Sequence, residues 1–187
     1  MKKILFGMIR RWNLRSALAC FLVLPVWASG QSEEVKKATY LIEVDQTVKA
    51  IDLLTEASKT YPSSSVLQYH LGIAYLRSGQ RDQAAASFDK GISLDSDEPL
   101  NYVGRGHVSV LEDNVQKAQL DFDKALAMTK SKNVVVLNAI AKAYLSDSRL
   151  AEKATGTLTR SKSIDDRNPE TLILLGDAYL AQNNGGL

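Results

Sequence analysis

The sequence predicts an all-α fold, an α-solenoid of antiparallel helix hairpins, and three features of the chain predict it. The hexapeptide LGIAYL at 71–76 returns as LGDAYL at 175–180, 104 residues later, which is close to three periods of about 34 residues. Small residues recur at three places in each period. Larger apolar residues lie between them at spacings of three, four and seven, which place them on one face of an α-helix.

The first 30 residues indicate an export signal. They carry five basic residues and no acidic residue: Lys2, Lys3, Arg10, Arg11 and Arg15. The apolar run ALACFLVLPVWA at 17–28 is shorter than the roughly 20 residues that span a bilayer. Small residues follow it, so we expect cleavage after Gly30 and a mature chain that begins at residue 31.

Three alternatives to a cleaved signal stay open. The segment could remain as an uncleaved membrane anchor, or Cys20 could carry a lipid, although most of the apolar run follows this cysteine. Arg10-Arg11 could belong to a twin-arginine signal, but Asn13 stands where such a signal has a large apolar residue. Cleavage would remove the chain's one cysteine, so the mature protein would hold no disulfide and would depend on packing alone.

The period divides the rest of the chain into helix hairpins. The units are 31–64, 65–98, 99–132 and 133–168, followed by a partial fifth unit at 169–187. The compact residues of the three small columns are Ala38, Gly72, Gly106, Ala141 and Gly176; Ala50, Ala84, Ala118 and Ala154; and Ala57, Gly91, Ala125 and Ser161. A small residue lets two helix backbones approach closely. The larger apolar residues that recur between the small ones fill the space beside each helix crossing.

Each unit is expected to contain a helix A and a helix B. In the second unit these are residues 66–78 and 81–94, with Gly79-Gln80 in the turn between them. Prolines near unit boundaries, Pro62, Pro99 and Pro169, fit helix ends and first helical turns. The fourth unit is two residues longer than the others, and we place one extra residue before its helix A and one in the turn near Asp147.

These columns resemble the tetratricopeptide repeat. Leu71-Gly72-x-x-Tyr75 followed by Ala84-x-x-x-Phe88 carries the resemblance, which covers residues 31–187, about four and a half repeats. The usual aromatic residue near the start of helix A occurs only as Tyr102, and the usual late proline only as Pro62. The resemblance implies a right-handed solenoid whose A helices line a concave groove that holds another protein or a peptide.

The resemblance also implies which side chains line that groove. They are Tyr69, Ile73, Leu76 and Arg77 in the second unit, Val103, His107 and Val110 in the third, Asn138 and Lys142 in the fourth, and Ile173 and Asp177 in the fifth. Some members of the family grip a peptide's terminal carboxylate with lysine, arginine and asparagine. In this chain the corresponding early positions of the groove hold Tyr69 and Ile73. We therefore expect an apolar helix or extended peptide instead.

Composition and motifs exclude several other functions. Without residues 1–30 the chain has 18 basic against 21 acidic residues, which argues against nucleic-acid binding. His70 and His107, the only two histidines, lack a third ligand for a metal. Gly104-Arg105-Gly106 lacks the preceding strand and third glycine of a dinucleotide site. We therefore expect no cofactor, no metal and no catalytic activity.

The fifth unit ends soon after its helix A, at residues 171–182. Leu174, Leu175, Ala178 and Tyr179 leave this helix apolar on much of its surface, where a terminal solenoid helix needs a polar outer face. The sequence could be the N-terminal piece of a longer repeat protein. Otherwise this end packs against a partner or a second copy, which would make the chain a homo-oligomer.

The sequence therefore predicts a non-enzymatic interaction scaffold, exported to the periplasm or cell envelope of a bacterium, with a protein or peptide as its partner. A membrane would be involved only if the N-terminal segment stays attached. Two alternatives remain open: the adaptor portion of a larger exported enzyme that continues beyond Leu187, and a self-assembling structural solenoid.

Overall fold

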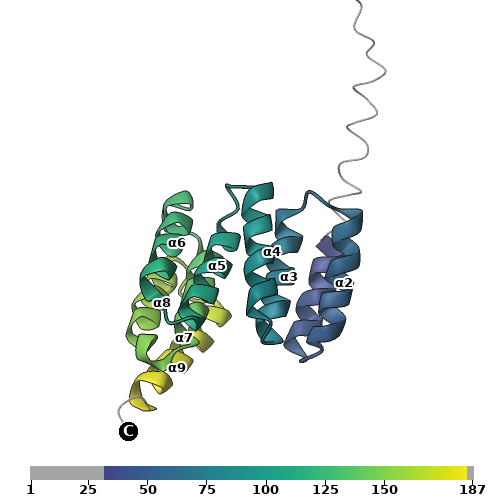
Figure 1. The fold of residues 1–187 in the computed structure, drawn as a ribbon. Helices are drawn as coiled ribbons and strands as arrows, with labels where there is room; N and C mark the ends of the chain where they lie inside the picture. Colours follow the sequence, from purple (N-terminus) through teal and green to yellow (C-terminus); the bar gives the residue numbers. More distant parts are fainter. Residues whose placement is uncertain (1–31, 185–187) are drawn as a thin grey trace, which may run out of the picture.

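The structure is a computed structural model that describes residues 32–184, so the predicted export signal lies outside the described residues. The described chain is a series of helices with no strand, which confirms the all-α prediction. A first helix covers residues 32–43. The later helices are α2 (Thr47–Thr60), α3 (Ser65–Arg77), α4 (Arg81–Leu94), α5 (Pro99–Leu111), α6 (Val115–Met128), α7 (Val134–Leu145), α8 (Ala151–Ile164) and α9 (Pro169–Asn184). Figure 1 shows them side by side along the stack.

The helices begin and end close to where the period predicted them. Helix α3 lies one residue earlier than the predicted 66–78, and α4 has the predicted bounds. The longer fourth unit contains a short 3-10 turn, Ser148–Leu150, ahead of α8. The Asp147 carboxylate accepts a hydrogen bond from the Arg149 backbone N–H at 2.9 Å, so the extra residue is absorbed in a capped turn at the end of the hairpin.

Local side chains fix the helix starts. The Ser64 hydroxyl accepts a hydrogen bond from the Leu67 N–H at 3.1 Å, which satisfies one of the free donors in the first turn of α3. Helices α5 and α9 begin at Pro99 and Pro169, where a proline loses no internal hydrogen bond. Boundaries of this kind come directly from the sequence and set the length of each hairpin.

The turns inside the first three hairpins share one unusual backbone conformation. Asp45, Gly79 and Asp113 occupy the same place in their units, and their φ angles are 59°, 77° and 61°. This left-handed conformation suits glycine and is tolerated by aspartate. The tight turn brings helix B back against helix A in each of these units.

The small columns explain how the two helices of a hairpin nest. A Cβ placed on Gly72 would lie 2.4 Å from the Phe88 ring, and one on Gly106 would lie 2.5 Å from the Phe122 ring. Both rings are fully buried. The aromatic residue of helix B therefore rests directly on the backbone of helix A, and no side chain larger than hydrogen fits between them.

Phe88 also explains a glycine that lies outside the small columns. A Cβ on Gly104 of α5 would lie 2.2 Å from the same ring. The ring is thus held between its own hairpin and the next one. Gly104, part of the apparent G-x-G motif, is consistent with this packing role.

Twelve of the thirteen compact residues of the small columns are buried. The exception is Gly176 on α9, which is exposed and whose Cβ would meet no atom within 4 Å. At the equivalent place in two earlier units, Gly72 and Gly106 receive the aromatic ring of their own helix B. No helix follows α9 within residues 32–184. Gly176 therefore has no helix B side chain packed against it among these residues.

The helices form two layers with different spacing. Helices α3, α5, α7 and α9 each contact the next member of that set, whereas the backbones of α4, α6 and α8 do not approach one another. Closer spacing in one layer bends the stack toward it, so the A helices lie on the inner side and the B helices on the outer side. We call the inner layer of α3, α5, α7 and α9 the A-helix face.

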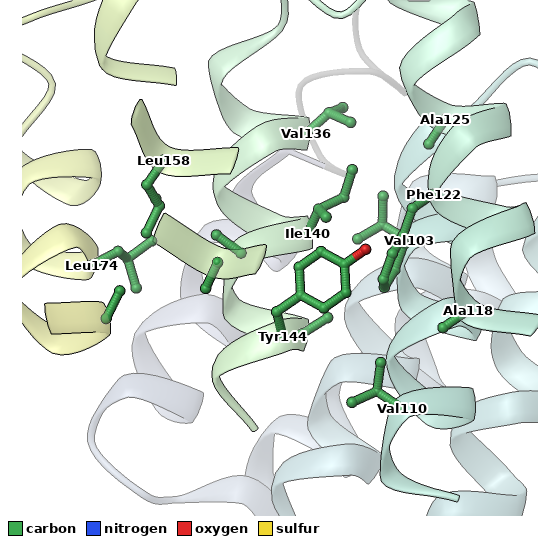
Figure 2. Close-up of a cluster of buried hydrophobic side chains, with 14 of the residues drawn as sticks. Val103, Val110, Ala118, Phe122, Ala125, Val136, Ile140, Tyr144, Leu158 and Leu174 are labelled. Atoms are coloured by element: carbon green, nitrogen blue, oxygen red, sulfur yellow. The ribbon is translucent and has the colours of Figure 1, made fainter. Parts of the chain in front are cut away.

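The largest buried cluster joins the last hairpins. Val103 of α5, Phe122 of α6, Ile140 of α7, Leu158 of α8 and Leu174 of α9 all belong to it, and Figure 2 shows their side chains converging between the helices. Leu174, Leu175 and Ala178 are buried in this cluster. Three of the four apolar residues singled out on this helix are thus covered by the preceding hairpin, whereas the fourth, Tyr179, is 54% exposed.

We predict that Gly72→Ala lowers the free energy of unfolding by about 1–3 kcal/mol, because its methyl group would overlap the Phe88 ring. Gly176→Ala is the matched control at the same place in the fifth unit. It should stabilise the protein by about 0.5–1 kcal/mol, because alanine favours a helix and the added methyl group meets nothing. Urea denaturation followed by circular dichroism measures both changes, and equal effects would contradict the packing argument.

Candidate protein-binding face

The eleven predicted groove residues all lie on the A-helix face, but their exposure varies widely. Val103, Val110 and Asn138 are buried, with 1–3% of their surface exposed. Tyr69, Ile73, Leu76 and His107 are half-buried. Arg77, Lys142, Ile173 and Asp177 are exposed. Only the half-buried and exposed members have surface that another molecule could contact.

The apolar part of the face is centred on α3. Tyr69, Ile73 and Leu76 pack against the buried cluster around Phe88, and the Tyr69 ring centroid lies 6.1 Å from that of Phe88. One side of each residue is thus fixed by the core. The other side remains exposed in part, so α3 presents an apolar strip whose side chains already have a defined position.

The two histidines are held neutral by their surroundings. Burial lowers the pKa of His70 to about 4. The His70 and Tyr69 rings pack in a T-shaped arrangement with their centroids 5.2 Å apart. Burial, and then the positive charge of Arg77, lower the pKa of His107 to about 4. Desolvation disfavours the protonated form of each ring, so neither histidine adds charge to the face at neutral pH.

Glu170, at the start of α9, was not among the predicted residues, yet its side chain joins α7 to α9. Its carboxylate accepts hydrogen bonds from the Asn138 amide at 3.0 Å and from the Lys142 ammonium. Burial disfavours its charged form, but these bonds and the Lys142 charge outweigh burial and lower its pKa. Glu170 stands where earlier units have Val66, Leu100 and Val135, and a single acid in an apolar column was the signal that could have identified it.

The influence of Glu170 extends to α3. Burial is the main reason that the Tyr69 pKa is raised, and the negative charges of Glu170 and then Glu98 raise it further. The Tyr69 phenol therefore stays neutral.

Asn138 is committed to the fold. Its amide oxygen accepts hydrogen bonds from the hydroxyls of Ser161 at 2.8 Å and Thr171 at 3.0 Å. Its amide nitrogen donates to Glu170 and, at 3.4 Å, to the Asn168 side chain. All four of its hydrogen-bonding positions are used within the chain, so Asn138 joins α7, α8 and α9 and has no free group for a ligand.

The face offers binding chemistry. Among residues 32–184, no group of three or more histidine, cysteine, aspartate or glutamate side chains could hold a metal ion. Within the same residues, no helix has the length and apolar character needed to cross a bilayer. What the face presents is an apolar strip on α3, a basic residue at Arg77, an ion pair on α7 and α9, and exposed Ile173.

The fold and this face define the class of protein: an α-solenoid of stacked helix hairpins with an inner layer of A helices. The sequence model of the tetratricopeptide repeat matches residues 66–98, which contain α4 and nearly all of α3. The same hairpin recurs before and after this match. The chain thus contains a tetratricopeptide repeat at residues 66–98, within a stack of similar hairpins.

Comparison with a curated protein agrees with this assignment. The chain is 27% identical over 117 residues to tetratricopeptide repeat protein 1 of Schizosaccharomyces pombe. The aligned part covers 61% of this chain and only 11% of the relative. The chain therefore spans about a ninth of the length of that protein.

Solved structures show the same fold at low identity. A thermophilic tetratricopeptide repeat protein of Thermus thermophilus superposes with a TM-score of 0.64 at 16% identity, over 89% of this chain and 97% of that one. The PilF protein of Pseudomonas aeruginosa gives a TM-score of 0.60 at 14% identity, over 84% of this chain and 71% of the other. At these identities the likeness concerns the fold alone.

We predict that stability falls as the pH is lowered from 7.5 to 5. Each histidine has a folded pKa of about 4 against an ordinary value of 6.5, so the unfolded chain binds more protons in this range. The stabilisation is complete above pH 6.5 and is lost toward pH 4, by about 1–2 kcal/mol per histidine at pH 5. Urea titrations of the wild type and of His70→Gln/His107→Gln test this, because the double variant should show a much smaller loss.

We predict different costs for the two ends of the Glu170 network. Asn138→Ala should destabilise the protein by about 2–4 kcal/mol, because it removes the buried amide that bonds Ser161, Thr171 and Glu170 together. Lys142→Ala should cost less than about 1 kcal/mol, because its ion pair is half exposed. Hydrogen exchange of α9 measures both variants, and similar protection in the two would contradict the assigned roles.

Proposed function

We propose that the chain is a non-enzymatic scaffold that binds a peptide or a helix of another protein on its A-helix face. The observation that supports this most directly is the half-buried strip of Tyr69, Ile73 and Leu76 on α3. Its side chains are fixed from behind by the Phe88 cluster. Because these receiving side chains are already ordered, they lose less conformational freedom when a partner binds.

The chemistry of the face favours an apolar ligand with a limited number of charges. Arg77 is exposed beside the apolar strip, while Lys142 is already paired with Glu170 and Asn138 is fully bonded within the chain. A terminal carboxylate would therefore find no set of free lysine, arginine and asparagine side chains among the predicted residues. An amphipathic helix or an extended apolar peptide is the better match.

The place of action that we propose is the periplasm or cell envelope of a bacterium. This part of the proposal depends on the basic and apolar pattern of residues 1–30, which lie outside the described structure. Fractionation of cells, with mass spectrometry of the mature N-terminus, tests it. Recovery from the cytoplasm of a chain that still begins at Met1 would contradict export.

Site-specific photo-crosslinking tests the proposed binding face. We predict that a photoreactive amino acid in place of Arg77, on the A-helix face, captures a partner from the envelope fraction of the source organism. The same amino acid in place of Lys90, an exposed cation on the outer helix α4, is the matched control and should not capture it. Equal capture at the two positions, or capture at Lys90 alone, would contradict binding on the A-helix face.

Self-assembly is a second candidate function, and the exposed apolar residues of α9 favour it. Leu172, Ile173, Tyr179 and Leu180 are 44–66% exposed on this last described helix. Apolar side chains gathered on one helix favour association. Light scattering of the full chain as a function of concentration tests this: a concentration-dependent dimer that Tyr179→Lys/Leu180→Lys abolishes would support it, and a monomer at high concentration would exclude it.

A further inference from the structure

A cleft lies on the outer side of the stack, away from the A-helix face. It occupies about 320 Å³ between α6 and α8, with α7 beneath it. Its floor is apolar and its α8 wall is basic. The lining residues are Gln119 and Leu126 of α6, Leu137 and Tyr144 of α7, and Lys153, Gly156, Thr157 and Arg160 of α8.

The equivalent gap one unit earlier, between α4 and α6, is bridged. The Arg105 guanidinium of α5 bonds Asp89 of α4 at 3.0 Å and Asp121 of α6 at 2.6 Å and 2.9 Å. The Lys124 ammonium lies over the Tyr102 ring, 4.3 Å from its centroid. These contacts tie the two outer helices together through the helix beneath them.

The repeat changes these bridging residues in the next unit. Ile140 stands in place of Arg105, and Thr157 stands in place of Asp121. Ile140 is buried in the core cluster and carries no charge. The Arg105 bridge is specific to the third unit, since the second unit has Leu71 and Ser87 at these two positions, and among residues 32–184 no ion pair joins α6 to α8.

The basic wall has no acidic partner within the described residues. Lys153 and Arg160 are exposed, and no ion pair joins either of them to a carboxylate between residues 32 and 184. The Lys153 ammonium lies 5.8 Å from the centroid of the Tyr144 ring. Two unpaired cations on one wall attract a negatively charged ligand.

The floor of the cleft has its polar groups already paired. The Tyr144 hydroxyl donates a hydrogen bond to the Gln119 side chain at 2.8 Å, and Figure 2 shows the Tyr144 ring beside Phe122. Gln119 in turn donates to Asp123 at 2.9 Å. Burial, and then the charge of Asp123, raise the pKa of Tyr144 to about 12, so the phenol stays neutral where its small exposed part lines the cleft.

Gly156 is a separate sign that the cleft is kept open. It lies inside α8, where glycine is less favourable than alanine. A Cβ at this position would meet no atom within 4 Å, so no packing contact within the described chain requires a glycine. A side chain here would instead occupy the cleft itself.

From these observations we propose that the α6–α8 cleft is a second binding site, for an acidic segment of a partner protein that inserts one apolar side chain. The apolar side chain would rest on Leu137 and Tyr144, and flanking carboxylates would face Lys153 and Arg160. A volume of about 320 Å³ is at the lower end for ligand pockets and suits a side chain with its adjoining backbone. This site is independent of the proposed A-helix face.

Fluorescence anisotropy with the full chain tests the site. The probes are three labelled nonapeptides with a central leucine, phenylalanine or tryptophan between glutamates, plus one with a central alanine and one with lysine flanks. We expect at least one acidic probe with an apolar centre to bind, with affinity falling as salt rises. The alanine-centred and lysine-flanked probes should bind at least tenfold more weakly.

Three variants locate the binding. Lys153→Glu/Arg160→Glu should weaken it at least tenfold, and Gly156→Leu, which fills the cleft without a clash at its Cβ, should do the same. Lys117→Glu/Lys90→Glu makes the same charge change at the equivalent positions of earlier units and should leave binding unchanged. Circular dichroism confirms that each variant is folded.

Several outcomes would overturn the proposal. These are no binding of any acidic probe, equal losses in the two charge variants, or no loss in Gly156→Leu. Equal binding of the alanine-centred probe would indicate general charge attraction, and equal binding of the lysine-flanked probe would indicate a purely apolar surface. Self-association of the wild type that Gly156→Leu abolishes would assign the cleft to a second copy of the chain.

Discussion

The stack depends on one steric constraint: a large side chain of each B helix needs a small residue, alanine or glycine, at the facing position of its A helix. Phe88 and Phe122 rest on Gly72 and Gly106 with no room for a methyl group. Dense packing of this kind leaves a core little freedom to absorb extra volume. The hairpin geometry, the spacing of the layers and the surfaces that remain outside all follow from this fit.

Because the repeat fixes the packing, its departures from regularity determine what each surface can do. Glu170 replaces an apolar residue and gathers Asn138 and Lys142 into a network between α7 and α9. Arg105 replaces the aliphatic residue of neighbouring units and bridges the outer helices α4 and α6, whereas Ile140 gives α6 and α8 no such bridge. The regular positions build the scaffold, and the irregular positions give its inner and outer faces different chemistry.

The sequence predicted most of the fold and only part of the candidate site. The small columns and the prolines placed the helices within a residue or two, because these features act locally and repeat. The exposure of each predicted groove residue was harder to predict. Val103 and Asn138 share the inner side of their helices with Lys142, but contacts from neighbouring units bury them. The Glu170 network and the α6–α8 cleft depend on side chains of three helices, and no single stretch of sequence contains them.

Among the helices from α2 to α9, all contacts are local along the chain. No helix contacts another that is more than two helices away in the order. The relative contact order is therefore low, which favours rapid folding because few long loops must close first. Such a stack behaves as a one-dimensional series in which neighbouring units stabilise each other. The two end helices of the described stack, residues 32–43 and α9, have neighbours on one side only, so we expect unravelling to begin at an end.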